Sequence, residues 1–531
     1  MLAITYAAAL YGIDGFPVTV ECTARRGLAS FEIVGLPDAA VRESEKRIFT
    51  GAANCGFPLP DMDAVVNLAP ADRKKEGTAL EMAILCALYK SCGILGEECD
   101  LSAMCFIGEI SFSGEIRPVR GVLGMTLAAI GAGKTEIFVP EANIREASVA
   151  ETSGVSIYGV KDIPTLLAHL NGGETMTPSC ANPLAHMEAP LFSEDFSQVK
   201  GQFRAKRAME AAAAGGHNIL LIGPPGSGKS MLAKRLPTIL PPMSREEALE
   251  ATKIHSCAGM LNDEIPFIRS RVFRSPHHSL STASLVGGGR IPAPGEISLA
   301  HNGVLFLDEF PEFRKDAMEA LRQPLEDRQV TITRAAGRVT YPSTFTMVCA
   351  MNPCPCGYFG SRNENHPCTC TQKAIHGYLE KISGPMLDRI DIQIEVPALS
   401  FAELSETKPG EPSAEIRQRV TAARELSRRR FRENGFERAD SLCNGVMETE
   451  ALRRFCALDE SCTKVMEDVF RKMQLSGRAY DRILRVARTL ADLEAVTGGA
   501  AETEGVIGGP IRKHHLLEAV QMRTLDRKYF G

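Results

Sequence analysis

Residues 223–230 constrain the fold of this chain more than any other segment, because they match the phosphate-loop pattern GxxxxGK[ST]. The apolar run at residues 218–222 indicates a buried strand before the loop, and residues 231–236 are typical of a helix after it. In such loops backbone N–H groups point at phosphate oxygens, the lysine pairs with the β- and γ-phosphates, and the hydroxyl holds Mg²⁺. The sequence therefore predicts an ATP site formed by Gly223, Pro224, Pro225, Gly226, Ser227, Gly228, Lys229 and Ser230.

Two later strands end in polar residues that suit nucleotide hydrolysis. Residues 304–307 are apolar and lead to Asp308 and Glu309. This pattern predicts that Asp308 binds Mg²⁺ and that Glu309 polarises the attacking water, and the alternative is two solvated acids at an ordinary strand end. A third apolar run leads to Asn352, which we predict to orient the water beside the γ-phosphate as sensor 1. The alternative for Asn352 is a turn residue.

Two arginines complete the predicted catalytic set. Arg389 is predicted to reach the nucleotide of a neighbouring subunit as an arginine finger, and the alternative is a salt bridge to Asp388 or Asp391. Arg478, near the start of a C-terminal helix, is predicted to contact the γ-phosphate of its own subunit as sensor 2, and the alternatives are Arg482 and Arg485. The order of phosphate loop, acid pair, amide and arginines resembles that of AAA+ ATPases, which work as rings with active sites shared between subunits.

Composition adds few limits. A chain of 531 residues can hold roughly two to four domains, and its net charge of −5 predicts that any nucleic-acid surface is local rather than global. We find no signal-peptide pattern and no apolar run of membrane-spanning length. The expected location is therefore cytoplasmic, with no membrane partner.

Residues 328–341 are predicted to form a β-hairpin, because two alternating runs flank the turn residues 335–337. Arg334 and Arg338 stand near its tip and are predicted to grip the phosphates of a threaded DNA strand. The alternative is pairing with acids of the next subunit. The hairpin resembles the one that lines the central pore in magnesium-chelatase-type rings, and residues 273–303 resemble the helix-2 insert of the same proteins.

Four cysteines follow Asn352 with the spacing CxC–x11–CxC, and they are Cys354, Cys356, Cys368 and Cys370. Four thiolates within 17 residues suit tetrahedral Zn²⁺. His366 is a spare ligand, and a reducing cytosol favours metal over disulfides. With four protein ligands the zinc would be structural, bracing the loop of Asn352 or projecting toward DNA. The alternative is four reduced thiols in a surface loop.

The front of the chain resembles the proteolytic domain of Lon proteases, which has a ribosomal S5 domain 2-like fold, on the strength of residues 75–79 and 107–143. Lon proteases use a serine nucleophile paired with a lysine. The matching positions here hold Ala79 and Leu123, neither of which can supply or activate a nucleophile. The resemblance therefore implies a Lon-like domain without protease activity, acting as a ring-forming or DNA-guiding platform.

The whole chain resembles the YifB/ComM family of magnesium-chelatase-like AAA+ ATPases. The expected fold is α/β, with a P-loop AAA+ core and a helical lid behind the Lon-like α+β domain. The expected parts are the Lon-like domain, a linker, the core with its cysteine-rich insert, and the lid. Their boundaries are residues 1–170, 171–195, 196–400 and 401–531.

The resemblance also implies a function. The family implies cytosolic hexamers that use ATP and Mg²⁺ to drive branch migration of DNA during uptake and recombination. The expected partner is therefore DNA, either single-stranded or branched. The alternative is a magnesium-chelatase-like ATPase that remodels a protein or a metal-insertion partner. The sequence shows no acidic metal-binding repeat like that of a chelatase partner subunit, and the hairpin tip lacks the aromatic-hydrophobic-Gly pattern common in protein-threading rings.

Overall fold

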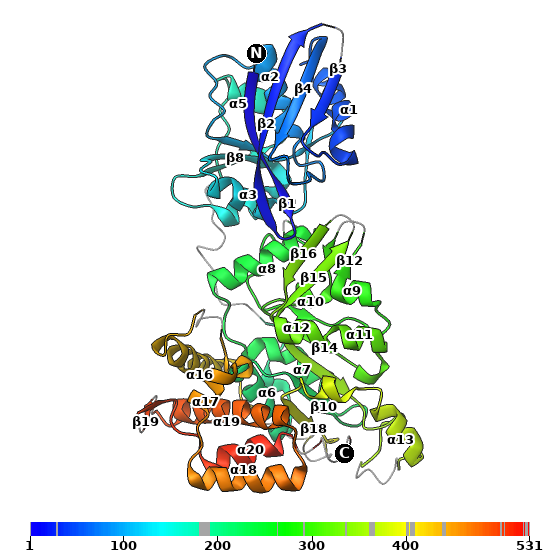
Figure 1. Cartoon of the computed structure of the whole chain (residues 1–531), viewed down its shortest axis with the longest axis vertical. Helices are drawn as coiled ribbons and strands as arrows, with labels where there is room; N and C mark the ends of the chain where they lie inside the picture. The colour runs from blue at the N-terminus through cyan, green and yellow to red at the C-terminus, as the bar shows by residue number, and fades with distance from the viewer. Residues whose placement is uncertain are drawn as a thin grey trace.

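The computed structural model of the chain describes residues 2–27, 30–179, 192–262, 264–289, 292–334, 337–360, 367–399, 403, 409–437, 442–499, 502–503, 505–523, 525 and 529. Three predicted features lie outside the described residues: the hairpin tip at residues 335–336, His366, and the middle of the linker at residues 180–191. Figure 1 shows an elongated molecule with the N-terminal domain at one end, the phosphate-loop core in the middle and the C-terminal helices at the other end.

The N-terminal domain begins with β1 (Leu2–Tyr11), β2 (Asp14–Arg26), β3 (Ser30–Val34), α1 (Ala39–Asn54), β4 (Met62–Ala69) and α2 (Glu81–Cys92). The strands form one sheet in the order β1-β2-β4-β3, in which β1 and β2 make a long antiparallel hairpin. Alternating buried and exposed residues along β4 leave one apolar face. The largely apolar α2 packs on the β1–β2 hairpin and is buried along most of its length.

The second half of this domain is a smaller α/β unit. Its parallel sheet contains β5 (Met104–Phe106), β8 (Glu136–Pro140) and β9 (Ser156–Val160), and β6 (Glu109–Ile110) pairs with β7 (Ile116–Arg117). The helices are α3 (Val122–Gly131), α4 (Ile144–Ala147) and α5 (Ile163–Leu170). The expected α+β character of the front domain agrees with this arrangement.

The core is a five-stranded parallel sheet in the order β11-β14-β17-β10-β18. Its strands are β10 (Ile219–Ile222), β11 (Phe273–Arg274), β14 (Val304–Leu307), β17 (Thr346–Met351) and β18 (Ile392–Glu395). The residues of β10, β14 and β17 are all buried, as expected for parallel strands covered on both faces. Because the strands are parallel, the residues that follow β10, β14 and β17 gather at one edge of the sheet, called here the carboxyl edge.

Helices surround the sheet, and one hairpin forms a separate two-stranded sheet. The helices are α6 (Phe203–Gly215), α7 (Lys229–Ile239), α8 (Arg245–Cys257), α9 (Thr282–Val286), α10 (Glu296–Leu299), α11 (Lys315–Ala320), α12 (Arg322–Asp327), α13 (Gln372–Leu379) and α14 (Gly384–Leu387). The predicted hairpin is present as β15 (Gln329–Arg334) paired with β16 (Gly337–Pro342). The short strands β12 (Gly287–Gly288) and β13 (Ala293–Pro294) pair within the insert that precedes β14.

The C-terminal part is mainly helical, as predicted. Its elements are α16 (Ser413–Glu433), α17 (Thr449–Phe455), α18 (Glu460–Met473), α19 (Gly477–Thr497), β19 (Glu502–Thr503), β20 (Val506–Ile507) and α20 (Lys513–Gln521). The alanine-rich α6 allows close approach of α16 and α19, so these helices and the sheet share one hydrophobic core. In the part of the chain that the structure covers, no helix combines the length and apolar character needed to cross a bilayer.

The N-terminal domain contacts the core through the tip of its β1–β2 hairpin (Figure 1). The Tyr11 hydroxyl donates a hydrogen bond of 2.6 Å to the backbone carbonyl of Arg338 in β16. Lys253 of α8 pairs with Asp14 at 2.6 Å. Leu123, at the start of α3, is fully buried in an apolar cluster shared with α8. Leu123, which we predict to stand at the position of the Lon lysine, is therefore an interdomain packing residue.

Candidate functional site

The phosphate loop connects β10 to α7 at the carboxyl edge. Gly226 and Gly228 have φ values of +74° and +92°, in the region that favours glycine. At Gly223 a Cβ atom would come within 2.1 Å of the Val396 carbonyl oxygen, so only glycine fits between the loop and the end of β18. These constraints explain the glycine positions of the pattern and leave the loop at the N-terminus of α7, where a phosphate would bind.

Lys229 is the central cation of this edge. Its Nζ donates to the carbonyls of Gly223 at 2.7 Å and Pro224 at 2.9 Å and to Oδ1 of Asn352 at 3.2 Å. Burial lowers the pKa of Lys229 to about 8, although Asp308 opposes the shift. The ammonium group of Lys229 thus donates to carbonyl oxygens of its own loop. A bound nucleotide phosphate can replace these oxygens as the hydrogen-bond acceptor.

The predicted magnesium ligands are already together. The Ser230 hydroxyl donates to Oδ2 of Asp308 at 2.8 Å, while Oδ1 of Asp308 accepts the backbone N–H of Glu309 at 2.9 Å. A hydroxyl and a carboxylate are hard oxygen ligands of the type that Mg²⁺ prefers, usually with nucleotide phosphates and waters as its remaining ligands. The pair fits Mg²⁺ in the role that the sequence predicts.

Glu309 faces solvent and has one partner from a distant part of the sequence. Its side chain is 58% exposed, and Oε2 lies 3.1 Å from Nδ1 of His278. Its φ of +51° lies in the left-handed region, a strain that is more common at functional sites. His278 follows β11 within the insert of residues 273–303. The predicted catalytic carboxylate of Glu309 is therefore held by a side chain of that insert.

Two residues at this site, His278 and Gln202, have no role predicted from the sequence. The Gln202 amide donates to the carbonyls of Ser227 at 3.2 Å and Pro397 at 2.7 Å, which ties the phosphate loop to the chain after β18. Gln202 precedes α6 and lies far from the motif in sequence, so no local pattern indicates it. For His278, the paired histidines in the insert were the available signal.

Arg389 lies at the opposite, amino edge of the sheet, because it precedes β18 while the phosphate loop follows β10. The two strands run side by side over four residues, which span about 13 Å, so Arg389 cannot reach its own nucleotide. Its side chain is 8% exposed, and its guanidinium pairs with Glu326 and donates to the Pro385 carbonyl at 2.6 Å. Contact with a nucleotide therefore requires a neighbouring subunit, and the Glu326 pair must open.

Arg478 lies at the same amino edge, which differs from the predicted contact within one subunit. Its side chain is 68% exposed, and its guanidinium lies 3.7 Å from the carboxylate of Asp388. One turn later Arg482 pairs with Asp391, which caps the start of β10 through the N–H of Asn218. Because these pairs fix the start of α19 against the amino edge, the structure does not support a contact of Arg478 with the nucleotide of its own subunit.

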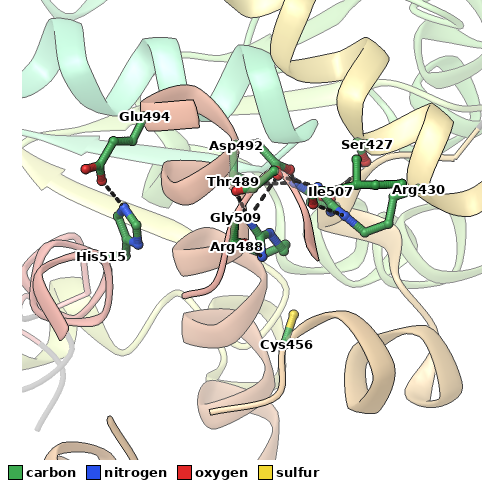
Figure 2. Close-up of polar contacts among 12 residues, drawn as sticks. Ser427, Arg430, Cys456, Arg488, Thr489, Asp492, Glu494, Ile507, Gly509 and His515 are labelled. Atoms are coloured by element: carbon green, nitrogen blue, oxygen red, sulfur yellow. Dashed lines mark hydrogen bonds and ion pairs between the residues drawn. The ribbon is translucent and has the colours of Figure 1, made fainter. Parts of the chain in front are cut away.

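Figure 2 shows the buried charges that fix α19 to its neighbours. Arg430 of α16 pairs with Asp492 of α19, and Asn444 donates to the same carboxylate at 2.7 Å. Arg488 donates to the carbonyls that follow β20 at 2.6 and 2.7 Å. Thr489 of α19 bonds the ring of His217 at 2.8 Å. This network joins the C-terminal helices to the first strand of the core.

Comparison with known proteins identifies the family of the chain. A model described as "Magnesium chelatase, subunit ChlI" matches residues 195–404. Models described as "Subunit ChlI of Mg-chelatase" and "Magnesium chelatase, subunit ChlI C-terminal" match residues 20–143 and 410–523. YifB of Salmonella typhimurium is 39% identical over 531 residues, which are 99% of this chain and 98% of that protein. Competence protein ComM of Haemophilus influenzae is 39% identical over 534 residues, with the same coverage of 99% and 98%.

This chain belongs to the YifB/ComM family of magnesium-chelatase-like AAA+ ATPases. Membership implies ATP and Mg²⁺ as ligands, in agreement with the phosphate loop and the Ser230–Asp308 pair. A more distant relative is DNA replication licensing factor mcm-5 of Caenorhabditis elegans, 26% identical over 257 residues, which are 46% of this chain and 27% of that protein.

The hairpin presents its arginines to solvent. Val330, Ile332 and Val339 point into the core, whereas Arg334 and Arg338 are exposed. Among the described residues neither arginine forms an ion pair, and Arg334 makes only a hydrogen bond to the Thr333 carbonyl next to it. The two cations are therefore available to a ligand or to a second subunit.

The structure brings the four cysteines of the CxC pairs together just behind Asn352. Each offers one sulfur, and all four sulfurs lie within 4.8 Å of one another. Burial opposes ionisation of Cys356, yet hydrogen bonds from the backbone N–H groups of Tyr358 and Thr369 and from neighbouring thiols lower its pKa to about 6. A donor set of four converging sulfurs, one of them easily ionised, fits a tetrahedral metal ion.

A second cluster, of Glu494, His514 and His515, also has converging donor atoms. Nδ1 of His515 accepts the backbone N–H of Arg512 at 3.0 Å, so the ring proton of the neutral imidazole is on Nε2. That Nε2 donates to the Glu494 carboxylate, as Figure 2 shows. The cluster is satisfied as a helix-to-helix hydrogen bond without a metal.

Proposed function

We propose that this chain is an ATP-hydrolysing, ring-forming motor that acts on DNA, as a helicase or branch-migration factor in recombination or natural transformation. The observation that carries the proposal is the division of the nucleotide site. The phosphate loop, the acid pair and Asn352 occupy the carboxyl edge, whereas Arg389 occupies the amino edge. Each subunit thus carries a phosphate-loop half at one edge and an arginine half at the other. A complete site would form where the phosphate-loop half of one subunit meets the arginine half of the next.

In the proposed reaction Lys229 takes the charge of the β- and γ-phosphates, and Ser230 and Asp308 hold Mg²⁺. Asn352, which contacts Lys229 directly, positions the attacking water with Glu309. Glu309 must release His278 to face that water. Fixed charges of this kind stabilise the transition state because they are in place before charge develops.

The amino edge supplies the rest from the neighbouring subunit, in a ring that we propose to be a hexamer. Arg389 leaves Glu326 for the γ-phosphate of the neighbour, a stronger anion. Arg478 is exposed and contacts Asp388, the residue directly before Arg389. We therefore propose that Arg478 also acts on the nucleotide of the neighbouring subunit. This replaces the predicted role of Arg478 within one subunit.

DNA is proposed as the substrate because of the hairpin. Arg334 and Arg338 are exposed cations without acidic partners among the described residues, on a hairpin that is anchored at its base by buried apolar residues. ComM is named a competence protein and mcm-5 a DNA replication licensing factor. Together these observations favour a DNA strand in the pore, with the arginines on its phosphates.

Changing Arg334 and Arg338 together to alanine is expected to weaken DNA binding and to leave ATP hydrolysis without DNA near the wild-type rate. Each lost phosphate contact should make the negative slope of log affinity against log salt less steep by about 0.7 on single strands. Fluorescence anisotropy with labelled DNA across a salt series measures the slope. The measurement separates phosphate contacts from changes in folding.

The matched control is the Arg334→Lys, Arg338→Lys double variant, which keeps both charges and should retain most of the affinity. If the alanine variant keeps the wild-type affinity and slope but assembles less well, the arginines pair with acids of the next subunit instead. That result would remove the hairpin from the proposed DNA path.

We propose four parts with the boundaries predicted from the sequence: residues 1–170, 171–195, 196–400 and 401–531. The first is a Lon-like domain without protease activity, since Ala79 and Leu123 carry no reactive group and Leu123 is buried against α8. Through Tyr11 it contacts the backbone of the hairpin, which suits a platform that guides DNA to the pore. The proposed location is the cytoplasm.

A second candidate is a chelatase-like ATPase that remodels a protein or metal-insertion partner. The observation in its favour is that all three matching family models are named for magnesium chelatase. The nucleotide site would be the same in both cases. Stimulation of hydrolysis by DNA separates the two candidates, because a chelatase-like ATPase should respond only to its protein partner.

A further inference from the structure

We infer that Cys354, Cys356, Cys368 and Cys370 bind one Zn²⁺ ion that braces the carboxyl edge of the nucleotide site. The sulfur of Cys354 lies 3.3 Å from that of Cys356 and 3.7 Å from that of Cys368, and the last two are 3.5 Å apart. Four sulfurs around a zinc with bonds of about 2.3 Å would stand about 3.8 Å apart. The observed separations are those of a single-ion site.

The surroundings of the sulfurs match a thiolate site rather than a thiol core. The backbone N–H of Phe359 points at the sulfur of Cys354 at 3.3 Å, and that of Cys356 points at the sulfur of Cys370 at 3.4 Å. Such bonds stabilise negative sulfur. Cys354 is buried in the apolar cluster at the carboxyl edge, and Cys356, Cys368 and Cys370 are half-buried against it. Packing therefore helps to gather the sulfurs, and the N–H groups that point at them favour the thiolate form that a cation would bind.

The separations also favour zinc over an iron–sulfur cluster, the other common occupant of four thiolates. Thiolates that hold several iron atoms must stand farther apart, because inorganic sulfide and the metals lie between them. Here all four sulfurs lie within 4.8 Å of one another. With four protein ligands and no open position, the zinc would be structural.

The position of the site gives the metal its role. Cys354 follows Asn352 by two residues, and the backbone N–H of Asn352 donates to the Tyr378 hydroxyl. Gly357, with φ of +88°, lies so close to Pro225 of the phosphate loop that a Cβ would come within 2.6 Å of the proline ring. The zinc loop is thus in contact with the phosphate loop on one side and continuous with Asn352 on the other.

Metal content of the purified full chain tests the site. About one zinc per chain is expected from cells grown with zinc. The Cys356→Ser and Cys370→Ser variants should lose at least about tenfold in occupancy, because a serine hydroxyl does not replace a thiolate ligand. Cys55→Ser, which changes a half-buried cysteine of the N-terminal domain, is the matched control and should keep the full zinc content.

If the variants fail to fold, cobalt titration of metal-depleted wild type decides the site instead. The charge-transfer and visible absorption of tetrahedral cobalt thiolate is the expected result. Wild type that contains no zinc and binds neither zinc nor cobalt would overturn the inference, as would iron with sulfide or a zinc content unchanged in both serine variants.

The bracing role is tested by amide hydrogen exchange, which does not depend on activity. Removing zinc from wild type should increase exchange in residues 223–228 and 352–357 and not in β1 or β2. Unchanged exchange in both loops would overturn the brace. The effect on hydrolysis rests on the proposed function: zinc removal should slow it about 10–100-fold, reversibly, because Asn352 is displaced. Zinc-loaded protein that hydrolyses no ATP would contradict the proposed function and leave the metal results standing.

Discussion

Lys229→Ala is expected to lower the rate of ATP hydrolysis by at least about 10²–10³-fold, equivalent to about 3–4 kcal/mol of transition-state stabilisation. The ammonium of Lys229 is the buried cation at the carboxyl edge, and alanine leaves the charge of the β- and γ-phosphates without that partner. It also removes the hydrogen bond that holds Asn352. Phosphate release measured at saturating ATP, with and without DNA, provides the test.

Lys234→Ala is the matched control, since Lys234 is an exposed lysine on the same helix α7. It should hydrolyse ATP at the wild-type rate. A Lys229→Ala variant that is folded and keeps full activity would contradict the assignment of the nucleotide site as a whole.

Arg389→Ala is expected to slow hydrolysis about 10³-fold while leaving ATP binding largely intact, because an arginine finger acts on transition-state charge. The structure makes a sharper test possible. Lys229 and Arg389 lie on opposite edges of the sheet. At each subunit interface, the Lys229 substitution therefore affects the subunit that binds the nucleotide, and the Arg389 substitution affects the subunit that supplies the arginine. Mixing the two inactive variants before assembly should restore about a quarter of the interfaces, those with an intact loop facing an intact finger.

Recovery of activity on mixing would place Arg389 in the site of the neighbouring subunit. No recovery, in rings shown to contain both variants, would mean that Arg389 acts within its own subunit or only through its pair with Glu326. Adding Arg478→Ala to the Lys229→Ala partner should reduce the recovery, since both arginines stand on the same edge.

The catalytic residues that the sequence predicts at the carboxyl edge are those that follow apolar strands. Because the strands are parallel, the residues that follow them lie at the same edge of the sheet. The proximity of Ser230, Asp308 and Asn352 to one another therefore follows from their positions in the sequence alone. The cysteine cluster is similar, because two short CxC turns bring their sulfurs to one place once the loop closes. In both cases sequence spacing and backbone geometry suffice.

Features that depend on packing between distant segments were not predictable in this way. Where α19 docks decides which edge Arg478 occupies, and that docking follows from buried pairs such as Arg482 with Asp391. Arg430 stands among several arginines of α16, residues 428–432, yet it is buried against Asp492. His278 and Glu309 are far apart in the sequence and meet only in the folded chain.

The most direct test of the proposed motor is the rate of ATP hydrolysis with no DNA, with single-stranded DNA and with a four-way junction, beside Lys229→Ala. We expect strong stimulation by DNA, greatest with the junction, and no activity of the variant in any condition. A wild-type rate that is the same with and without every DNA would contradict the DNA motor and favour a protein or metal-insertion partner, with the nucleotide site unchanged.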